Sequence, residues 1–558
     1  MAGGDRCVRP SRWATAARCG FGALAGAILG SLDGMMNRVW RGIAALGRAF
    51  GRPGAAFGFM ALMLGVAVAL QVGLQTGGRN DDAELLLFSQ TLALGYDALN
   101  PPLVIWLHWL VVQAVGPTLL SARLVVAVLL FAAYPLATAA ARRLTPDRGM
   151  ATFAGLALAA LVAWNWAPHL NLSHTVAMTA AGFALLWVTL RLLDRPTWLN
   201  WGLAGLVAGL GLLTKYNFAL LLAAVVLAGL LTPTTRRVLL SGRAVLGAAV
   251  TFVIAAPHYA WLLLHWSAFQ ELFDAKMGRD APVAGALEGI KGGLALLGEH
   301  SLMVLLPSVA LALLLFAPAV WRALVRPARV APVRRDRLVF AALVPVLLLL
   351  ILAGLVVGAG VTDIGAHHVY GLLVVVVPLF AWIARGEPGP RSRGLFALVA
   401  VVLTLVVPVF LTRMIVETAA TCEGKCNTAL PYGAYSADLT DAGFTGGTVV
   451  MVSSVHRFPM IFLRPHLPPA RYVKPLDSQK AAFAPPPRSE PGDCLVLWEA
   501  AHDPDRLDRL REDIPGQGAA LPDSAIVGVS TGALALSGRP AAHPLGYALI
   551  KGGVGACR

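Results

Sequence analysis

The chain has 558 residues, of which 57% are hydrophobic and only 13% charged, and its formal net charge is +15. Long apolar runs recur from Ala55 to Leu411, which is typical of a polytopic membrane protein and excludes an ordinary soluble globular chain. The positive charge comes from arginines clustered between the apolar runs, where it sets membrane orientation. This distribution argues against a nucleic-acid partner.

Residues 1–54 are arginine-rich and contain one weak apolar patch, Phe21–Leu32, that is too short to cross a membrane. No small-residue cleavage site follows a proper apolar core, so we predict no signal peptide. We expect a basic cytoplasmic N-terminal extension, either a surface helix or a disordered segment. The first span, about Ala55–Leu74, follows these arginines, so the next loop lies outside.

That external loop, residues 75–118, is acidic at its start. Three carboxylates, Asp81, Asp82 and Glu84, fall within four positions directly after the first span. Acidic side chains beside a membrane span are costly unless they are solvated or functional. Local physics alone favours a solvated loop cap, and a functional site is the alternative.

Two apolar runs follow, Leu103–Val115 and Leu119–Ala141, and the second ends in Arg142 and Arg143. Because arginines favour the inside, only one of the two runs crosses the membrane. The first is shorter and is led by two prolines, so we predict that it lies along the outer surface as an interfacial helix. Its Trp106 is typical of the aromatic belt at the membrane surface.

The run Leu199–Leu231 is interrupted by Lys215, and arginines flank both of its ends on one side. This pattern predicts a hairpin of two helices with Lys215 at its outer tip. Each arm has about fifteen residues, or roughly 23 Å, which is shorter than the roughly 30 Å hydrocarbon core. The tip is therefore expected to be recessed, so that Lys215 faces a cavity or a bound anion; the alternative is a lysine that snorkels to the interface as an anchor.

The total is about eleven spans, and an odd number places the C-terminus outside. The other predicted spans are Met150–Trp166, Thr175–Leu192, Val245–Leu264, Leu302–Trp321, Leu338–Val357, Tyr370–Ile383 and Leu395–Leu411.

Residues 415–558 are soluble in composition and contain short strand-like runs separated by proline and glycine, which predicts a small extracytoplasmic α/β domain. The runs are Thr448–Ser453, Cys494–Trp498, Ala525–Val529 and Ala548–Ile550.

Four of the six cysteines lie in this domain, which favours an oxidising compartment and up to two disulfides. We favour pairing of Cys422 with Cys426 and of Cys494 with Cys557, although four cysteines allow three connectivities. The first pair could instead hold a metal, but no second ligand pair follows it at zinc-site spacing.

The order of these features resembles the GT-C membrane glycosyltransferases, in particular the bacterial branch similar to protein O-mannosyltransferases and to the lipid A aminoarabinose transferase, of the glycosyltransferase family 39/83 type. The resemblance covers roughly residues 55–415. The motifs that carry it are Asp81-Asp82-Ala83-Glu84, Pro101-Pro102-Leu103-Val104-Ile105-Trp106-Leu107 and Gly211-Leu212-Leu213-Thr214-Lys215. The acidic pair of the family is usually Asp-Glu, and here it is Asp-Asp.

The resemblance implies transfer of a hexosyl or pentosyl group from a polyprenyl-phosphate donor to an acceptor hydroxyl on the outer face of the bacterial inner membrane. The acceptor would be lipid A or lipopolysaccharide, a glycan or a protein. Asp81 takes the role of general base, and Asp82 orients it or shares a divalent cation with it. Lys215 binds the donor phosphate. No other cofactor is expected.

Further contacts to donor or acceptor are expected from Glu84, Trp106, His367 and His368. The two histidines lie in the late external loop, residues 358–368, where relatives often carry a basic motif. In most proteins, two histidines in an exposed loop bind neither metal nor phosphate. The alternative that His367 and His368 have no binding role therefore stays open.

Two other functional classes remain. One is a transporter or lipid flippase without covalent chemistry, but the spans are nearly free of the mid-membrane ionisable residues that such proteins use. The other is a ligase or polymerase of surface glycans, which shares the chemistry and differs in the acceptor.

Overall fold

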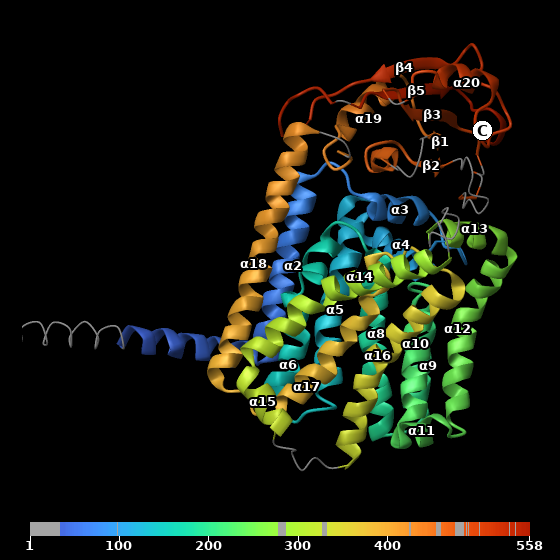
Figure 1. The fold of residues 1–558 in the computed structure, drawn as a ribbon. Coiled ribbons are helices and arrows are strands. Elements are labelled where there is room, and N and C mark those ends of the chain that lie inside the picture. The colour runs from blue at the N-terminus through green and yellow to red at the C-terminus, as the bar shows by residue number, and fades with distance from the viewer. Residues whose placement is uncertain are drawn as a thin grey trace, which may run out of the picture.

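The computed structural model describes residues 34–558, with gaps at 97–98, 277–285, 326–331, 423–425, 453–458, 475–484, 487, 489, 502, 535, 542 and 558. It is a bundle of long helices with a small sheet domain on one end (Figure 1). This confirms the predicted fold class. The apolar patch Phe21–Leu32 lies outside the described residues, whereas residues 34–50 form a helix that projects from the opposite end of the bundle (Figure 1).

Seven helices in the described part of the chain are long and apolar enough to cross a membrane, and two bent helix pairs raise this number to nine. The eleven predicted spans include two shorter apolar segments, Trp198–Leu212 and Tyr370–Ala384, so the number of spans stays a prediction. The seven long helices are α2 (Pro53–Leu74), α5 (Leu119–Ala141), α8 (Ser173–Asp194), α12 (Ala244–Leu264), α14 (Ala286–Leu315), α16 (Pro332–Ala359) and α18 (Pro390–Thr421).

The predicted span Met150–Trp166 is present as two helical segments with a bend between them, so whether it crosses the membrane stays a prediction. The chain forms α6 (Arg148–Leu156) and a 3-10 turn, then breaks at Leu161 and resumes as α7 (Val162–Trp166), with a bend of 73°. No proline or glycine stands at the break. Instead, a neighbouring helix binds a backbone group that the break exposes, because the Ser308 hydroxyl of α14 donates to the Ala157 carbonyl at 3.1 Å.

The predicted hairpin is present as α9 (Trp198–Leu212) and α10 (Phe218–Leu231), with Lys215 in the turn between them. A short helix, α11 (Pro233–Leu239), then turns by 114° away from α10 at the far end of the bundle. The predicted interfacial helix is α4 (Leu103–Val115), which lies beside α3 (Asn80–Phe88) below the sheet domain (Figure 1). The remaining helices of the bundle are α13 (Trp266–Lys276), α15 (Ala317–Val325) and α17 (Val376–Ala384).

Ion pairs identify the end of the bundle opposite the sheet domain. Asp194, at the end of α8, accepts from Arg143 Nη1 at 2.6 Å and also pairs with Arg337 of α16. These contacts hold the ends of α5, α8 and α16 together at the arginine-rich side, as the predicted alternation of loops requires.

The C-terminal domain is a five-stranded mixed sheet of order β2-β1-β3-β5-β4. Strand β1 pairs in parallel with β2 and β3, and β5 is antiparallel to both β3 and β4. Four strands match predicted runs, whereas β2 was not predicted because it is only four residues long and half-buried. The strands are β1 (Gly447–Met451), β2 (Ala470–Val473), β3 (Asp493–Glu499), β4 (Ile526–Ser530) and β5 (Leu545–Ile550), and helix α19 (Tyr432–Asp441) precedes them.

Disulfides join Cys422 to Cys426 and Cys494 to Cys557, the pairs that the sequence favoured. The first closes the chain directly after α18, and the second ties the central strand β3 to the C-terminus. Helix α18 has 32 residues, about 48 Å at 1.5 Å per residue, so it extends beyond a hydrocarbon core of roughly 30 Å and carries the chain to the sheet domain.

The sheet domain packs directly on the acidic helix α3 and shares one hydrophobic core with it. The Gln90 amide pairs with edge strand β2, donating to the Tyr472 carbonyl at 2.9 Å and accepting from its N–H at 2.8 Å. Arg464 donates to the Leu86 carbonyl near the end of α3 at 2.5 Å. Burial lowers the pKa of Arg464 to about 10, so it remains charged at neutral pH and suits the negative end of a helix.

The two ends of the bundle predict a labelling pattern. In protein with Cys7 and Cys19 replaced by serine, a single cysteine at Gln113, which is exposed on α4, should react with an impermeant maleimide in intact cells. A cysteine at Arg334, at the arginine-rich end, should react only after permeabilisation. Strong labelling at position 334 in intact cells would overturn the orientation.

Candidate active site

Asp82 fixes the start of helix α3. Its Oδ2 accepts from the Arg79 N–H at 2.8 Å and forms an ion pair with Arg123 Nη2 of α5 at 2.5 Å. Both side chains are almost fully enclosed, with exposures of 4% for Arg123 and 3% for Asp82. A Cβ at Gly78 would stand 2.5 Å from Asp82 Oδ2, so only glycine permits the chain to turn this closely around the carboxylate.

Burial raises the pKa of the Asp82 carboxyl, and the Arg123 guanidinium and the Arg79 N–H act in the opposite direction. A buried ion pair stabilises little on balance, but loss of one partner leaves an uncompensated charge. The pair therefore determines where α3 lies against α5.

Asp81 points the other way and caps helix α8. Its Oδ2 accepts from the Leu172 N–H at 2.7 Å, from the Ser173 N–H at 2.9 Å and from the Ser173 hydroxyl at 3.1 Å. A carboxylate at the N-terminus of a helix satisfies orphan donors and complements the helix dipole. Among the described residues, no donor contacts the other oxygen, Oδ1, and the side chain is half-buried.

Leu172 has a φ of 85°, in the left-handed region that an L-residue other than asparagine or glycine rarely adopts. The strain places two consecutive N–H groups on one carboxylate. Such outliers persist where surrounding contacts hold them, and they cluster at functional sites.

Lys215 reaches the same turn of α8 from the hairpin tip. Its Nζ donates to the Thr175 hydroxyl at 2.9 Å, and the side chain is half-buried. The tip is also joined to the interfacial helix, because the Leu103 N–H donates to the Leu213 carbonyl at 3.0 Å. The contact of Lys215 with Thr175 thus lies two residues along α8 from the cap that Asp81 makes at Ser173.

His174 lies between these two contacts and is 4% exposed. Its Nε2 contacts Glu84 Oε1 at 3.2 Å, and its Nδ1 contacts the Thr214 carbonyl at 3.1 Å. One imidazole therefore joins the acidic helix to the residue before Lys215. Asp81, Glu84 and Lys215 therefore all contact the first turn of α8, residues 172–175.

The interfacial helix contributes support. His108 of α4 is fully buried and contacts both the Leu85 carbonyl of α3 and the Ser121 hydroxyl of α5, each at 2.9 Å. Burial lowers the pKa of His108 to about 4, so it is neutral at physiological pH. Trp106 donates its indole N–H to the Ala93 carbonyl at 2.8 Å and so holds the loop after α3.

The late external loop also reaches the hairpin tip. The Asn217 amide donates to the His368 carbonyl at 3.3 Å, and the rings of His367 and His368 lie 4.1 Å apart between centroids. The two predicted histidines are therefore neighbours of the turn that carries Lys215.

An aromatic ladder that the sequence reasoning missed begins at Tyr216, directly after Lys215. Its ring stacks on His258, with centroids 5.9 Å apart, and the ladder continues through Trp261 to His265 along α12. The ladder therefore packs α12 against the hairpin tip.

The sequence analysis also did not assign Arg123 and His174 to the site, although the sequence around each residue contains a signal. Arg123 is a cation inside the apolar run of α5, and such a charge requires a partner. His174 stands in a polar triplet, Ser173-His174-Thr175, at the start of a membrane helix.

One group of three potential metal ligands occurs among the described residues, formed by Cys422, Cys426 and His543. The two cysteines are joined in a disulfide, which removes their thiolates as ligands.

The chain is similar in sequence and in fold to known membrane glycosyltransferases. Residues 99–261 match the family described as dolichyl-phosphate-mannose-protein mannosyltransferase. The lipopolysaccharide core galacturonosyltransferase RgtA of Rhizobium johnstonii is 32% identical over 259 residues, which cover 46% of this chain and 51% of RgtA. RgtB of the same organism is 34% identical over 204 residues, covering 36% of this chain and 41% of RgtB. The chain thus spans about half the length of the curated relatives it matches.

The crystal structure of ArnT from Cupriavidus metallidurans bound to undecaprenyl phosphate superposes with a TM-score of 0.55 at 16% identity, over 88% of this chain and 98% of ArnT. The apo form of the same protein gives a TM-score of 0.52 at 15% identity. The chain has a GT-C fold of the ArnT type. The predicted fold is therefore confirmed, and within this GT-C fold the family match contains the first turn of α8 and Lys215 but begins after Asp81 and Asp82.

The buried pair predicts a large effect on stability. Arg123→Met should destabilise the protein by about 3–5 kcal/mol, because Asp82 would stay buried without its counter-charge. Adding Asp82→Asn should recover much of the loss, since the amide oxygen still accepts from the Arg79 N–H. Chemical unfolding of detergent-purified protein measures both values.

Arg413→Met is the matched control, because Arg413 pairs with Glu417 on the exposed face of α18, with exposures of 70% and 59%. An exposed pair at this spacing contributes about 0.3–0.5 kcal/mol. Equal losses for the variants of Arg123 and Arg413 would contradict the role given to the Asp82–Arg123 pair.

Proposed function

We propose that the chain is a GT-C glycosyltransferase that moves a sugar from a polyprenyl-phosphate donor to an acceptor hydroxyl, on the outer face of the bacterial inner membrane. The observation that carries this proposal is the convergence of Asp81 and Lys215 on the first turn of α8. The relatives named as lipopolysaccharide core galacturonosyltransferases and the ArnT structure bound to undecaprenyl phosphate support the donor and acceptor classes.

In the proposed reaction the acceptor oxygen attacks the anomeric carbon while the bond from that carbon to the phosphate oxygen breaks. The acceptor proton passes to a carboxylate, and polyprenyl phosphate leaves as an anion. Its departure requires stabilisation of negative charge more than it requires a proton. One base without a covalent intermediate inverts the anomeric centre.

Asp81 is the proposed base, and its hydrogen bonds indicate which oxygen acts. Oδ2 is occupied by Leu172 and Ser173, so Oδ1 takes the proton. A carboxylate held by one oxygen on a helix N-terminus is fixed in direction, as a general base must be.

Lys215 is the proposed ligand of the donor phosphate. The Thr175 hydroxyl orients its ammonium, and the short arms of the hairpin keep it below the outer surface, where a phosphate attached to a lipid would lie. Asp82 is too enclosed to contact a reactant, so we assign it a positioning role through Arg79 and Arg123.

His174 is a further proposed positioning residue, because it fixes Glu84 relative to the tip that carries Lys215. Glu84, His367 and His368 then form the sides of the site, and the ladder from Tyr216 offers a flat apolar wall for a sugar ring. Trp106 acts through the loop that it holds.

The variants that test these roles differ in the step they affect. Asp81→Asn should reduce kcat by roughly a hundredfold to ten-thousandfold with little change in donor binding, because the amide keeps the Oδ2 contacts and loses the basicity. Lys215→Ala should weaken donor binding as well as turnover, since the phosphate is charged before and during departure. Asp82→Asn should be milder. Transfer is measured with reconstituted protein, a polyprenyl-phosphate sugar and lipopolysaccharide.

Glu417→Gln, on the exposed face of α18, serves as the control and should keep wild-type transfer. Wild-type activity of Asp81→Asn would show that another group is the base. Failure of the wild-type protein to bind any polyprenyl-phosphate sugar would favour the transporter hypothesis over the transferase. Mass spectrometry of lipid A, glycans and glycoproteins from cells that lack the protein identifies sugar and acceptor.

A further inference from the structure

The helix of residues 34–50, which we call the N-terminal helix, has no part in the proposed reaction. It runs sideways from the starts of α2 and α18, crosswise to both (Figure 1). Helices α2 and α18 are long and apolar enough to cross a membrane. A helix that lies crosswise to them at one end therefore runs along the plane of the bilayer.

The second half of the N-terminal helix is fixed to the bundle. A Cβ at Gly47 would stand 2.6 Å from the backbone nitrogen of Gly394 in α18, so glycine is needed for this close crossing. The guanidinium of Arg391, in the first turn of α18, lies 5.2 Å from the ring centroid of Trp40. These contacts fix the direction in which the helix leaves the bundle.

The N-terminal helix is amphipathic. With about 3.6 residues per turn, its charged residues and its large apolar residues fall on opposite faces. No carboxylate occurs within residues 34–50. The polar face carries Asn37, Arg38, Arg41 and Arg48, and the apolar face carries Met35, Met36, Val39, Ile43, Leu46 and Phe50.

The apolar face points toward the membrane part of the bundle. The ring of Phe50 packs edge-on against Phe59, inside α2, with centroids 5.5 Å apart. The bundle covers only this half of the face, because Met35 and Met36 are each 51% exposed and Val39 is 54% exposed. The uncovered half continues the same face away from α2 and α18, so it requires an apolar neighbour outside the bundle.

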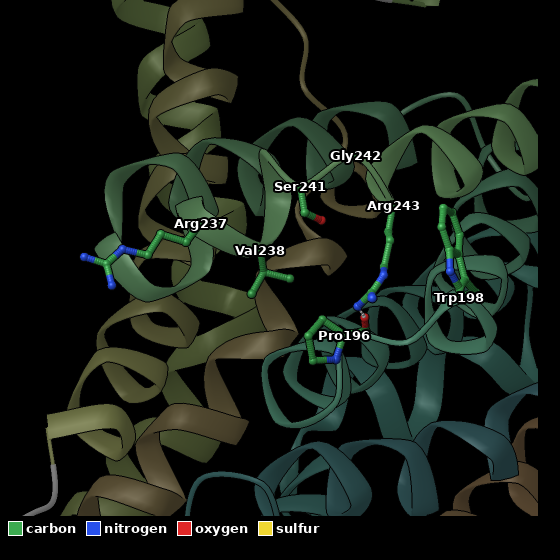
Figure 2. Close-up of a pocket in the computed structure, with 7 residues that line it drawn as sticks. All are labelled: Pro196, Trp198, Arg237, Val238, Ser241, Gly242 and Arg243. Atoms are coloured by element: carbon green, nitrogen blue, oxygen red, sulfur yellow. Dashed lines mark hydrogen bonds between the residues drawn. The ribbon is translucent and has the colours of Figure 1, made fainter.

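The N-terminal helix also lies at the level of a group of arginine–tryptophan contacts. The cation–π pairs of the described residues all lie at the arginine-rich end of the bundle: Arg191 with Trp187, Arg243 with Trp198, and Arg391 with Trp40. Figure 2 shows the second pair, in which Arg243 also donates to the Pro196 carbonyl at 2.7 Å. Tryptophan rings gather where a membrane meets water. This level therefore corresponds to one surface of the membrane.

We propose that the N-terminal helix binds the surface of an anionic lipid leaflet at the arginine-rich end of the bundle. Met35, Met36 and Val39 enter the boundary between headgroups and acyl chains, and Arg38 and Arg41 reach the anionic headgroups. A face that carries arginines and no acid fits the negative surface of such a leaflet. The proposal depends on α2 and α18 crossing the membrane and not on the proposed transferase activity.

Electron paramagnetic resonance of the full chain in phosphatidylglycerol vesicles tests this position. In protein with Cys7 and Cys19 replaced by serine, a nitroxide is attached at Val39 on the apolar face or at Ala45 on the polar face. The label at position 39 should collide with oxygen more than with a water-soluble nickel complex, and the label at position 45 should show the reverse. Position 45 is the matched control, because both residues are exposed on the same helix.

Arg38→Gln and Arg41→Gln test the contacts with headgroups. Arg41 donates to the Asn37 carbonyl of its own helix at 3.2 Å, and among the described residues neither arginine has a hydrogen bond or ion pair with another element. The helix should therefore stay folded and docked in both variants. Each replacement should lower the ratio of membrane-bound to aqueous label at position 39 by about fivefold in phosphatidylglycerol vesicles, and by much less in phosphatidylcholine vesicles.

Three results would overturn the proposal. Equal access of the nickel complex to positions 39 and 45 would show that the helix lies in water. Shielding of position 39 from both oxygen and the nickel complex would show that a protein, such as a second copy of the chain, covers the apolar face. An equal effect of the arginine variants in the two kinds of vesicle would show that anionic headgroups are not bound.

Discussion

The cap that Asp81 places on helix α8 is the interaction on which the site depends. It joins a loop that follows the first span to the start of the fourth predicted span, where Leu172 has a left-handed backbone conformation. An N-terminal cap contributes on the order of 1 kcal/mol, which is comparable to the strain of one such residue. The net gain in stability is therefore small, and the consequence is positional: the same helical turn that fixes one carboxylate also receives Lys215 through Thr175. A negative and a positive group are thereby set at one helix end.

The sheet domain also helps to position the candidate active site. Arg464 and Gln90 hold the far end of α3 against the sheet, while Asp82 and Arg123 hold its beginning against the bundle. The acidic helix has only nine residues, too few to be stable alone in water, so its position comes from these contacts. Motion of the sheet domain would therefore displace α3 and, with it, Asp81.

Much of this arrangement could be predicted from the sequence, because the strongest signals were local. Hydropathy and the placement of arginines predicted the ends of α4 and α5, and they also predicted the hairpin around Lys215. The apolar runs in these segments are bounded by prolines or charges, which makes their ends easy to recognise. The break at Leu161 had no such signal, because a contact from the distant Ser308 accompanies it. Residues Arg123 and His174 were visible as polar groups in apolar helices, but their partners Asp82 and Glu84 are 41 and 90 positions away, and only the fold reveals those pairs. Strand β2 was too short to give an alternating pattern.

The central claim is that the first turn of α8 brings the acceptor base and the donor phosphate site together. A cryo-electron microscopy structure of the full chain with a bound polyprenyl phosphate tests it most directly. The account predicts the phosphate within hydrogen-bonding distance of the Lys215 ammonium, about 3 Å, with Oδ1 of Asp81 facing the position that the sugar would occupy. A phosphate bound elsewhere, with Lys215 still held by Thr175 and Asp81 turned away from it, would contradict the account.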